Sequence, residues 1–279
     1  MQIGNCADPS PGVGAVRDPH RSGMGASAPV RLVLLMLLWL LLVSTHPVAL
    51  GAPSMQTATE CVILLHGLAR TSHSLRKLER ALGKAGFVTV NLGYPSREDS
   101  VEALAADVIP RSVAECRQRD TRVIHFVTHS LGGILVRQYL GQNRLAGLGR
   151  VVMLSPPNQG SEAADGLRAL RLYHWVNGPA GQQLGTGPDA LPARLGPVDY
   201  PVGIIAGNRH AFFDGWLADL IPGDDDGKVA VERAKLVGMR DFLVVPHAHP
   251  FIMDADEVIT QTMYFLRHGE FWRPAREAP

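Results

Sequence analysis

From residue 61 onward, short apolar runs alternate with longer segments in which apolar residues recur at helical spacing. Short continuous apolar runs are typical of strands buried on both faces of a sheet, and the helical spacing predicts the helices that cover those faces. The predicted strands are 62–65, 87–92, 122–127, 150–154, 202–206 and 241–245. The predicted helices are 74–85, 101–116, 134–140 and 256–266. This order predicts an α/β fold with a mostly parallel sheet of about six strands and helices on both faces.

Residues 160–200 interrupt this alternation. They are rich in Gly, Pro and Ala, and they contain one amphipathic piece, residues 167–176. An irregular segment of this length is uncommon inside a compact domain and is usually functional. We therefore interpret residues 160–200 as a lid or cap over a functional site. The alternative is a surface excursion that contributes packing only.

The N-terminal segment has a different composition. Residues 1–30 are rich in Gly, Pro, Ala and Ser, which is typical of disorder. Arg31 then precedes an unbroken apolar run, 32–43, which is short for a bilayer span but typical of a signal-peptide core. Small residues at 49–52 offer a cleavage site. Residues 1–52 are therefore predicted to be a disordered leader with a signal peptide, or with an uncleaved N-terminal anchor that would associate with a membrane.

This leader predicts export from the cytoplasm. Met24 would also start a signal peptide of ordinary length, so translation starts at either Met1 or Met24. In both cases we expect the folded domain, residues 60–272, to work as a periplasmic or secreted protein.

Export bears on the cysteines, because disulfides persist in oxidising compartments. Cys6 lies in the leader, which leaves Cys61 and Cys116. Cys61 begins the first predicted strand, and Cys116 ends the helix that leads into the third. Since strand starts and helix ends lie at the same edge of a parallel sheet, the two side chains are predicted to be neighbours. A Cys61–Cys116 disulfide is one hypothesis, and two buried free thiols are the other.

The composition argues against nucleic acid and metal ions as partners. The formal net charge is +1 and the pI is about 7.9, so no basic surface for nucleic acid is expected. The cysteines do not have the spacing of metal ligands, and we expect no metal site.

Residues 128–132, Thr-His-Ser-Leu-Gly, carry the strongest chemical signal. They follow a predicted strand and begin a predicted helix, and a serine held there by small residues is typical of a nucleophile elbow, usually G-x-S-x-G. Here Thr128 replaces the first glycine. The sharp turn requires small residues on both sides of the serine, and the helix N-terminus favours developing negative charge. Ser130 is therefore the predicted nucleophile.

A serine nucleophile needs a base, and an acid that orients the base. Three aspartates at 224–226 follow the strand 202–206, and His247 and His249 follow the strand 241–245. Both groups come after carboxyl ends of strands, the edge where α/β proteins build their sites. An acidic turn or a lone histidine is more often structural. The order Ser, Asp, His, with each residue after a suitable strand, nevertheless predicts a catalytic triad.

Together these segments resemble the α/β-hydrolase superfamily, and in particular its small secreted lipases and esterases. In those lipases the acid commonly precedes Gly-x-Val, a form found here in residues 226–229. Their catalytic histidine lies in a loop before an apolar helix start. The resemblance therefore implies Asp226 rather than Asp225 as the acid, and His249 rather than His247 as the base.

The resemblance extends to the oxyanion hole. Residues 64–68, Leu-Leu-His-Gly-Leu, resemble the lipase loop that binds the oxyanion, which implies the backbone N–H groups of Leu68 and Leu131 as the two donors. No chemistry is assigned to His66. Residues 155–161 resemble the Pro-rich loop by which lipases enter their lid region.

We therefore expect a lipase or esterase that cleaves a small-molecule or lipid ester through an acyl-enzyme and needs no cofactor. A close alternative is a thioesterase, or a deacylase or acyltransferase acting on a lipid-linked substrate. A different class is a catalytically silent hydrolase-fold module that binds a lipid or a partner. Such modules usually lose a triad member, whereas this chain retains Ser130, Asp226 and His249.

Overall fold

The computed structural model describes residues 59–167, 171–213 and 220–274. The predictions for the leader, and for the apolar face of the piece 167–176, lie outside this description. In the described part of the chain, no helix is both long enough and apolar enough to cross a membrane.

The strands form one sheet in the order β2-β1-β3-β4-β5-β6. Every neighbouring pair is parallel, so the predicted α/β class is confirmed and the sheet is parallel throughout. The bounds are β1 (Glu60–Leu65), β2 (Val88–Val90), β3 (Val123–His129), β4 (Leu148–Leu154), β5 (Val202–Gly207) and β6 (Asp241–Val245).

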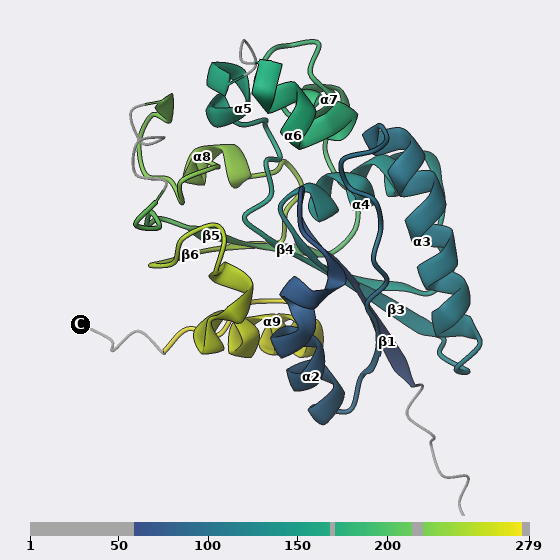
Figure 1. The fold of residues 1–279 in the computed structure, drawn as a ribbon. Helices are drawn as coiled ribbons and strands as arrows, with labels where there is room; N and C mark the ends of the chain where they lie inside the picture. The colour runs from purple at the N-terminus through teal and green to yellow at the C-terminus, as the bar shows by residue number, and fades with distance from the viewer. Residues whose placement is uncertain (1–58, 168–170, 214–219, 275–279) are drawn as a thin grey trace, which may run out of the picture. The chain divides into compact units, whose positions relative to one another are not determined.

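Helices cover both faces of this sheet (Figure 1). Successive strand residues point to opposite faces, so Ile63 and Leu65 pack under α3 and α4, while Val62 and Leu64 pack under α2 and α9. The helices are η1 (Ser72–Leu75), α2 (Arg76–Lys84), α3 (Val101–Arg117), α4 (Leu131–Gln142), α5 (Glu162–Leu167), α6 (Arg171–Gln182), α7 (Leu191–Arg194), α8 (Val231–Ala234), η3 (Ile252–Asp254) and α9 (Asp256–His268).

Local chemistry sets the ends of the longest helices. The Ser100 side chain accepts the Ala103 N–H and so caps the start of α3. Gly269 ends α9 in the left-handed conformation, with φ of 79°. These two residues explain why α3 and α9 begin and end close to the predicted bounds.

The segment 160–200 contributes α5, α6 and α7, which Figure 1 shows gathered together in green. Ser161 Oγ donates a hydrogen bond of 2.6 Å to the Lys228 carbonyl oxygen, and the Ser161 N–H donates to the Leu184 carbonyl oxygen at 2.9 Å. The segment is therefore attached to the loop after β5. Its role as a lid that opens and closes stays a prediction.

A disulfide joins Cys61 at the start of β1 to Cys116 at the end of α3, with a Cα–Cα distance of 5.9 Å. Both residues are fully buried in the core between the sheet and α3. The predicted proximity follows from the parallel topology. The strands β1 and β3 are neighbours, and α3 runs back to the edge of the sheet where both of them begin.

Removing this disulfide is expected to lower the free energy of unfolding by about 4 kcal/mol, the loop-closure value for a sequence separation of 55. Urea unfolding followed by circular dichroism measures the change in the double variant Cys61→Ala/Cys116→Ala. Reduction of the wild-type protein serves as the control, because it breaks the bond without removing sulfur from the core. An unfolding free energy that is the same with and without reductant would contradict the expectation.

Candidate active site

Ser130 lies between β3 and α4 with backbone angles φ 53° and ψ −118°. Positive φ is strained for a residue with a side chain, so the surrounding packing must impose it. Gly132 is part of that packing: a Cβ at this position would lie 2.5 Å from the Leu65 carbonyl oxygen. The helix can therefore begin directly behind the serine only because residue 132 has no side chain.

Thr128 occupies the position where the usual pattern has glycine. It is fully buried at the end of β3. A Cβ on Gly133 would lie 3.3 Å from Thr128 Oγ1, so the second of the two helix glycines leaves room for the threonine. The departure from the usual motif is thus accommodated locally.

Asp226 and His249 form a buried pair. His249 Nδ1 lies 2.8 Å from Asp226 Oδ2, and the His249 backbone N–H donates to the Asp226 carbonyl oxygen at 2.9 Å. The other carboxylate oxygen, Oδ1, accepts the backbone N–H groups of Lys228 and Val229 at 3.1 and 2.9 Å. With Nδ1–H donated to the carboxylate, the neutral ring carries its free lone pair on Nε2, where it can accept a proton.

Asp225 and His247, which the sequence analysis did not favour as the acid and the base, have other partners. Asp225 Oδ1 is 2.8 Å from His210 Nε2 and accepts the Gly227 N–H at 2.7 Å. His247 Nε2 lies 3.6 Å from a carboxylate oxygen of Glu257 on α9. The geometry therefore separates the two adjacent aspartates into two different Asp–His pairs.

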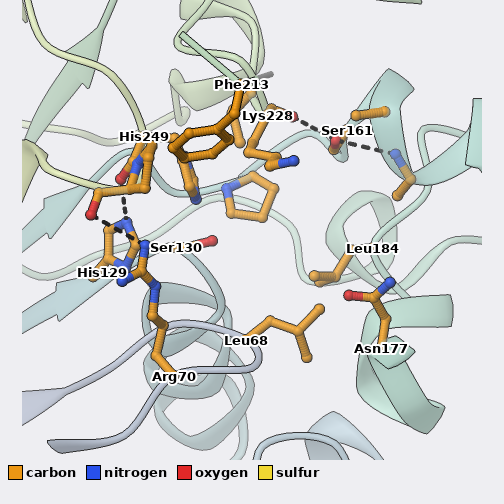
Figure 2. A pocket seen from close by; sticks show the side chains of 15 residues that line it. Leu68, Arg70, His129, Ser130, Ser161, Asn177, Leu184, Phe213, Lys228 and His249 are labelled. Atoms are coloured by element: carbon orange, nitrogen blue, oxygen red, sulfur yellow. Dashed lines mark hydrogen bonds between the residues drawn. The ribbon is translucent and has the colours of Figure 1, made fainter. Parts of the chain in front are cut away.

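Ser130 and His249 line the same cavity, whose volume is about 290 Å³. Figure 2 shows both residues on one side of this space, with Leu184 and Asn177 on the other. Within the part of the chain that is described, Ser130 Oγ makes no hydrogen bond. Serine–base hydrogen bonds are often long in unliganded enzymes and tighten when substrate binds.

The loop after β1 lies directly against the turn that carries Ser130. A Cβ on Gly67 would lie 2.7 Å from His129 Nδ1 and 3.2 Å from Ser130 Cβ, so only glycine permits this approach. Leu68 lines the cavity. Among the described residues, no acceptor is bound by the backbone N–H of either Leu68 or Leu131. Neither predicted oxyanion donor is therefore committed to a protein acceptor in the described ranges.

His66 has a structural role. Its ring stacks on Tyr94 with centroids 4.0 Å apart, Nδ1 donates to the Gly67 carbonyl oxygen at 2.9 Å, and Nε2 accepts the Tyr94 N–H at 3.3 Å. Burial lowers the pKa of His66 below its ordinary value, which favours the neutral ring. This histidine fixes the loop that carries Leu68.

His129 is a residue of the candidate site that the sequence analysis did not single out. Its Nε2–H donates to the His249 carbonyl oxygen at 3.0 Å, and the two rings lie 4.8 Å apart. Burial lowers its pKa well below the ordinary value, so the ring is neutral. His129 therefore positions the backbone of His249. The sequence signal that could have identified His129 is its position directly before Ser130.

Known proteins share this arrangement of elements. The family model described as "Alpha/beta hydrolase family" matches residues 62–275. The chain belongs to the alpha/beta hydrolase family. No curated protein matches this alpha/beta hydrolase.

Several solved structures are similar to this alpha/beta hydrolase in fold. The mature lipase BlEst2 from Bacillus licheniformis aligns with a TM-score of 0.58 and 21% identity, over 79% of this chain and 96% of the lipase. A structure of the metagenome-derived lipolytic enzymes LipS and LipT aligns with a TM-score of 0.53 and 17% identity, over 75% and 94%. YbtT, a type II thioesterase of yersiniabactin biosynthesis, aligns with a TM-score of 0.51 and 16% identity, over 78% and 97%.

The described part of this alpha/beta hydrolase contains no group of three or more His, Cys, Asp and Glu side chains that could hold a metal ion.

Proposed function

We propose that this alpha/beta hydrolase is a serine hydrolase that cleaves carboxylic esters, of the lipase or esterase type. The observation that carries the proposal is the buried Asp226–His249 pair, with a separation of 2.8 Å, whose histidine lines the same cavity as a serine held at positive φ. The positive φ of the serine costs conformational free energy, and the Asp–His pairing is geometrically specific. Together these residues supply the nucleophile, the base and the acid that acyl transfer requires.

The reaction follows from the roles of these groups. Ser130 Oγ attacks the ester carbonyl carbon while His249 Nε2 takes the hydroxyl proton, and Asp226 stabilises the imidazolium that forms. The oxyanion accepts hydrogen bonds from the backbone N–H groups of Leu68 and Leu131. Each donor contributes about 2.7–4 kcal/mol of transition-state stabilisation. Collapse releases the alcohol, which takes its proton from His249. Water activated by the same histidine then hydrolyses the acyl-enzyme.

Apolar side chains around the cavity support a substrate with an apolar acyl part. Leu68, Leu184 and Val229 line its walls, and Phe213 lies at its edge, half exposed. Phe213 packs against Phe251 with ring centroids 6.3 Å apart. Burial of a hydrocarbon chain against such a surface is favourable at about 25 cal/mol per Å².

Export is part of the proposal. The Cys61–Cys116 disulfide supports it, because such bonds persist in oxidising compartments and are rare in the cytoplasm. The protein would then be periplasmic or secreted, or would be held at a membrane by the N-terminal segment.

A fluorophosphonate probe is expected to label Ser130 in the wild-type protein, because an activated serine attacks phosphorus as it attacks an ester carbonyl. Peptide mass spectrometry locates the adduct. Absence of label on well-folded protein would overturn the proposal and favour a silent binding module.

A panel of p-nitrophenyl esters with short to long acyl chains, together with the matched thioesters, tests the substrate class. We expect higher kcat/KM for the esters than for the thioesters. A consistent preference for thioesters would favour thioesterase activity, which the similarity in fold to YbtT makes the second candidate.

A further inference from the structure

Arg70 lies beside the proposed catalytic histidine. It follows the Leu68 loop, lines the cavity, and donates from Nη2 to the Pro250 carbonyl oxygen at 3.1 Å. Pro250 directly follows His249 in the chain. Figure 2 shows the Arg70 side chain reaching toward His129 and Ser130, on the same side of the pocket as His249.

Among the described residues, the charged side chains that line this cavity are all cationic. Its described lining residues include two cationic side chains, Arg70 and Lys228, and no aspartate or glutamate. Arg70 is partly buried, and within the described ranges its side chain forms no ion pair and only the one hydrogen bond to Pro250. A guanidinium group has five N–H donors, and its preferred partners are carboxylate and phosphate oxygens. Most of its binding capacity is therefore left for a ligand.

The position of Arg70 also indicates which part of the ester it would face. His249 delivers a proton to the departing alcohol, so the alcohol part must lie on the histidine side of the pocket. Arg70 is tied to the residue next to His249, whereas Leu184 and Asn177 lie across the cavity.

We propose that the site selects esters whose alcohol part carries an anionic group, such as a phosphate, and that Arg70 binds this group. The inference rests on the proposed function, because it uses the catalytic direction of proton transfer. A competing explanation is that Arg70 only holds Pro250 in place or adds positive potential near the oxyanion. That role would affect neutral and anionic esters alike.

The test compares 1-butyrylglycerol 3-phosphate with neutral 1-butyrylglycerol, at fixed ionic strength. We expect the wild-type protein to prefer the phosphate ester in kcat/KM. Arg70→Gln should reduce this preference about 10- to 100-fold, the usual range for a charge-assisted hydrogen bond. Arg70→Lys should restore part of it, since it keeps the charge. Arg76→Gln, which removes one exposed arginine that does not line the cavity, is the matched control and should leave the preference unchanged.

A second pair of substrates tests the direction of binding. Mono-p-nitrophenyl succinate carries its anion on the acyl part, and p-nitrophenyl butyrate is its neutral counterpart. We expect little preference within this pair. A strong Arg70-dependent preference for the succinate would overturn the assignment of Arg70 to the alcohol side.

Binding of ethers separates this inference from the proposed function, because ethers cannot be hydrolysed. Isothermal titration should give tighter binding of 1-O-butylglycerol 3-phosphate than of 1-O-butylglycerol, and Arg70→Gln should abolish the difference. Hydrolysis of both glycerol esters without Arg70-dependent selectivity or binding would overturn the anion site and leave the esterase proposal standing. Arg70-dependent binding with no hydrolysis of any ester would support the anion site and overturn the esterase proposal.

Discussion

Ser130→Ala is expected to lower kcat for p-nitrophenyl ester cleavage about 10⁶-fold, because the acyl-enzyme can no longer form. The fold should persist, since Ser130 Oγ makes no hydrogen bond among the described residues and alanine fits the same volume. Steady-state turnover measures the loss, and thermal unfolding of the same preparation checks stability. A residual rate above the uncatalysed one is consistent with an intact oxyanion hole.

Ser155→Ala is the matched control for this variant. Ser155 is also buried, follows the carboxyl end of β4, and has a positive φ of 47°. It does not line the cavity, and its Oγ accepts the Gly207 N–H at 3.4 Å. Turnover by this variant should remain within a few-fold of wild type. Equal losses in the two variants would mean that the elbow is sensitive to any change nearby and would remove the case for Ser130 as nucleophile.

Asp226→Asn should lower kcat about 10⁴-fold, as expected when an amide replaces the carboxylate that orients a catalytic histidine. The amide nitrogen can donate to His249 Nδ1, which would place the ring proton on Nε2 and leave no base facing Ser130. Turnover measured from pH 6 to 9 shows whether the loss persists across this range, as a tautomer defect requires.

Asp225→Asn controls for this change, because it makes the same chemical substitution one residue away. Its side chain pairs with His210 and not with His249, so turnover should fall less than tenfold. A loss at Asp225 that equals or exceeds the loss at Asp226 would reverse the assignment of the acid.

The fold class could be predicted because short continuous apolar runs, typical of strands buried on both faces, alternate with longer segments of helical spacing. The predicted strand 241–245 coincides with β6. The predicted strand 87–92 is longer than β2 (Val88–Val90), an edge strand with only β1 beside it. Asn91 leaves the sheet there, and its side chain donates to the Ser72 carbonyl oxygen and to Glu79.

For helix α4 the predicted element was too short instead of too long. Helical spacing predicted a start at residue 134, whereas α4 begins at Leu131 and includes Gly132 and Gly133. Glycine is a poor helix former, so local propensity argues against this first turn. The close approach of Gly132 to the Leu65 carbonyl oxygen on β1 explains why glycine is needed there. This approach is a long-range contact, which local pattern does not contain.

The sequence by itself determined the parallel α/β order and the position of Ser130 between a strand and a helix. It also determined that the aspartates and histidines follow the carboxyl ends of strands. These features follow from periodicity and chain order, which are local properties. Only the tertiary structure decided that Asp226 pairs with His249 while Asp225 pairs with His210. It also placed His129 against the His249 carbonyl oxygen and Arg70 beside Pro250. These contacts join segments up to 180 residues apart, and angstrom-scale packing of side chains decides them.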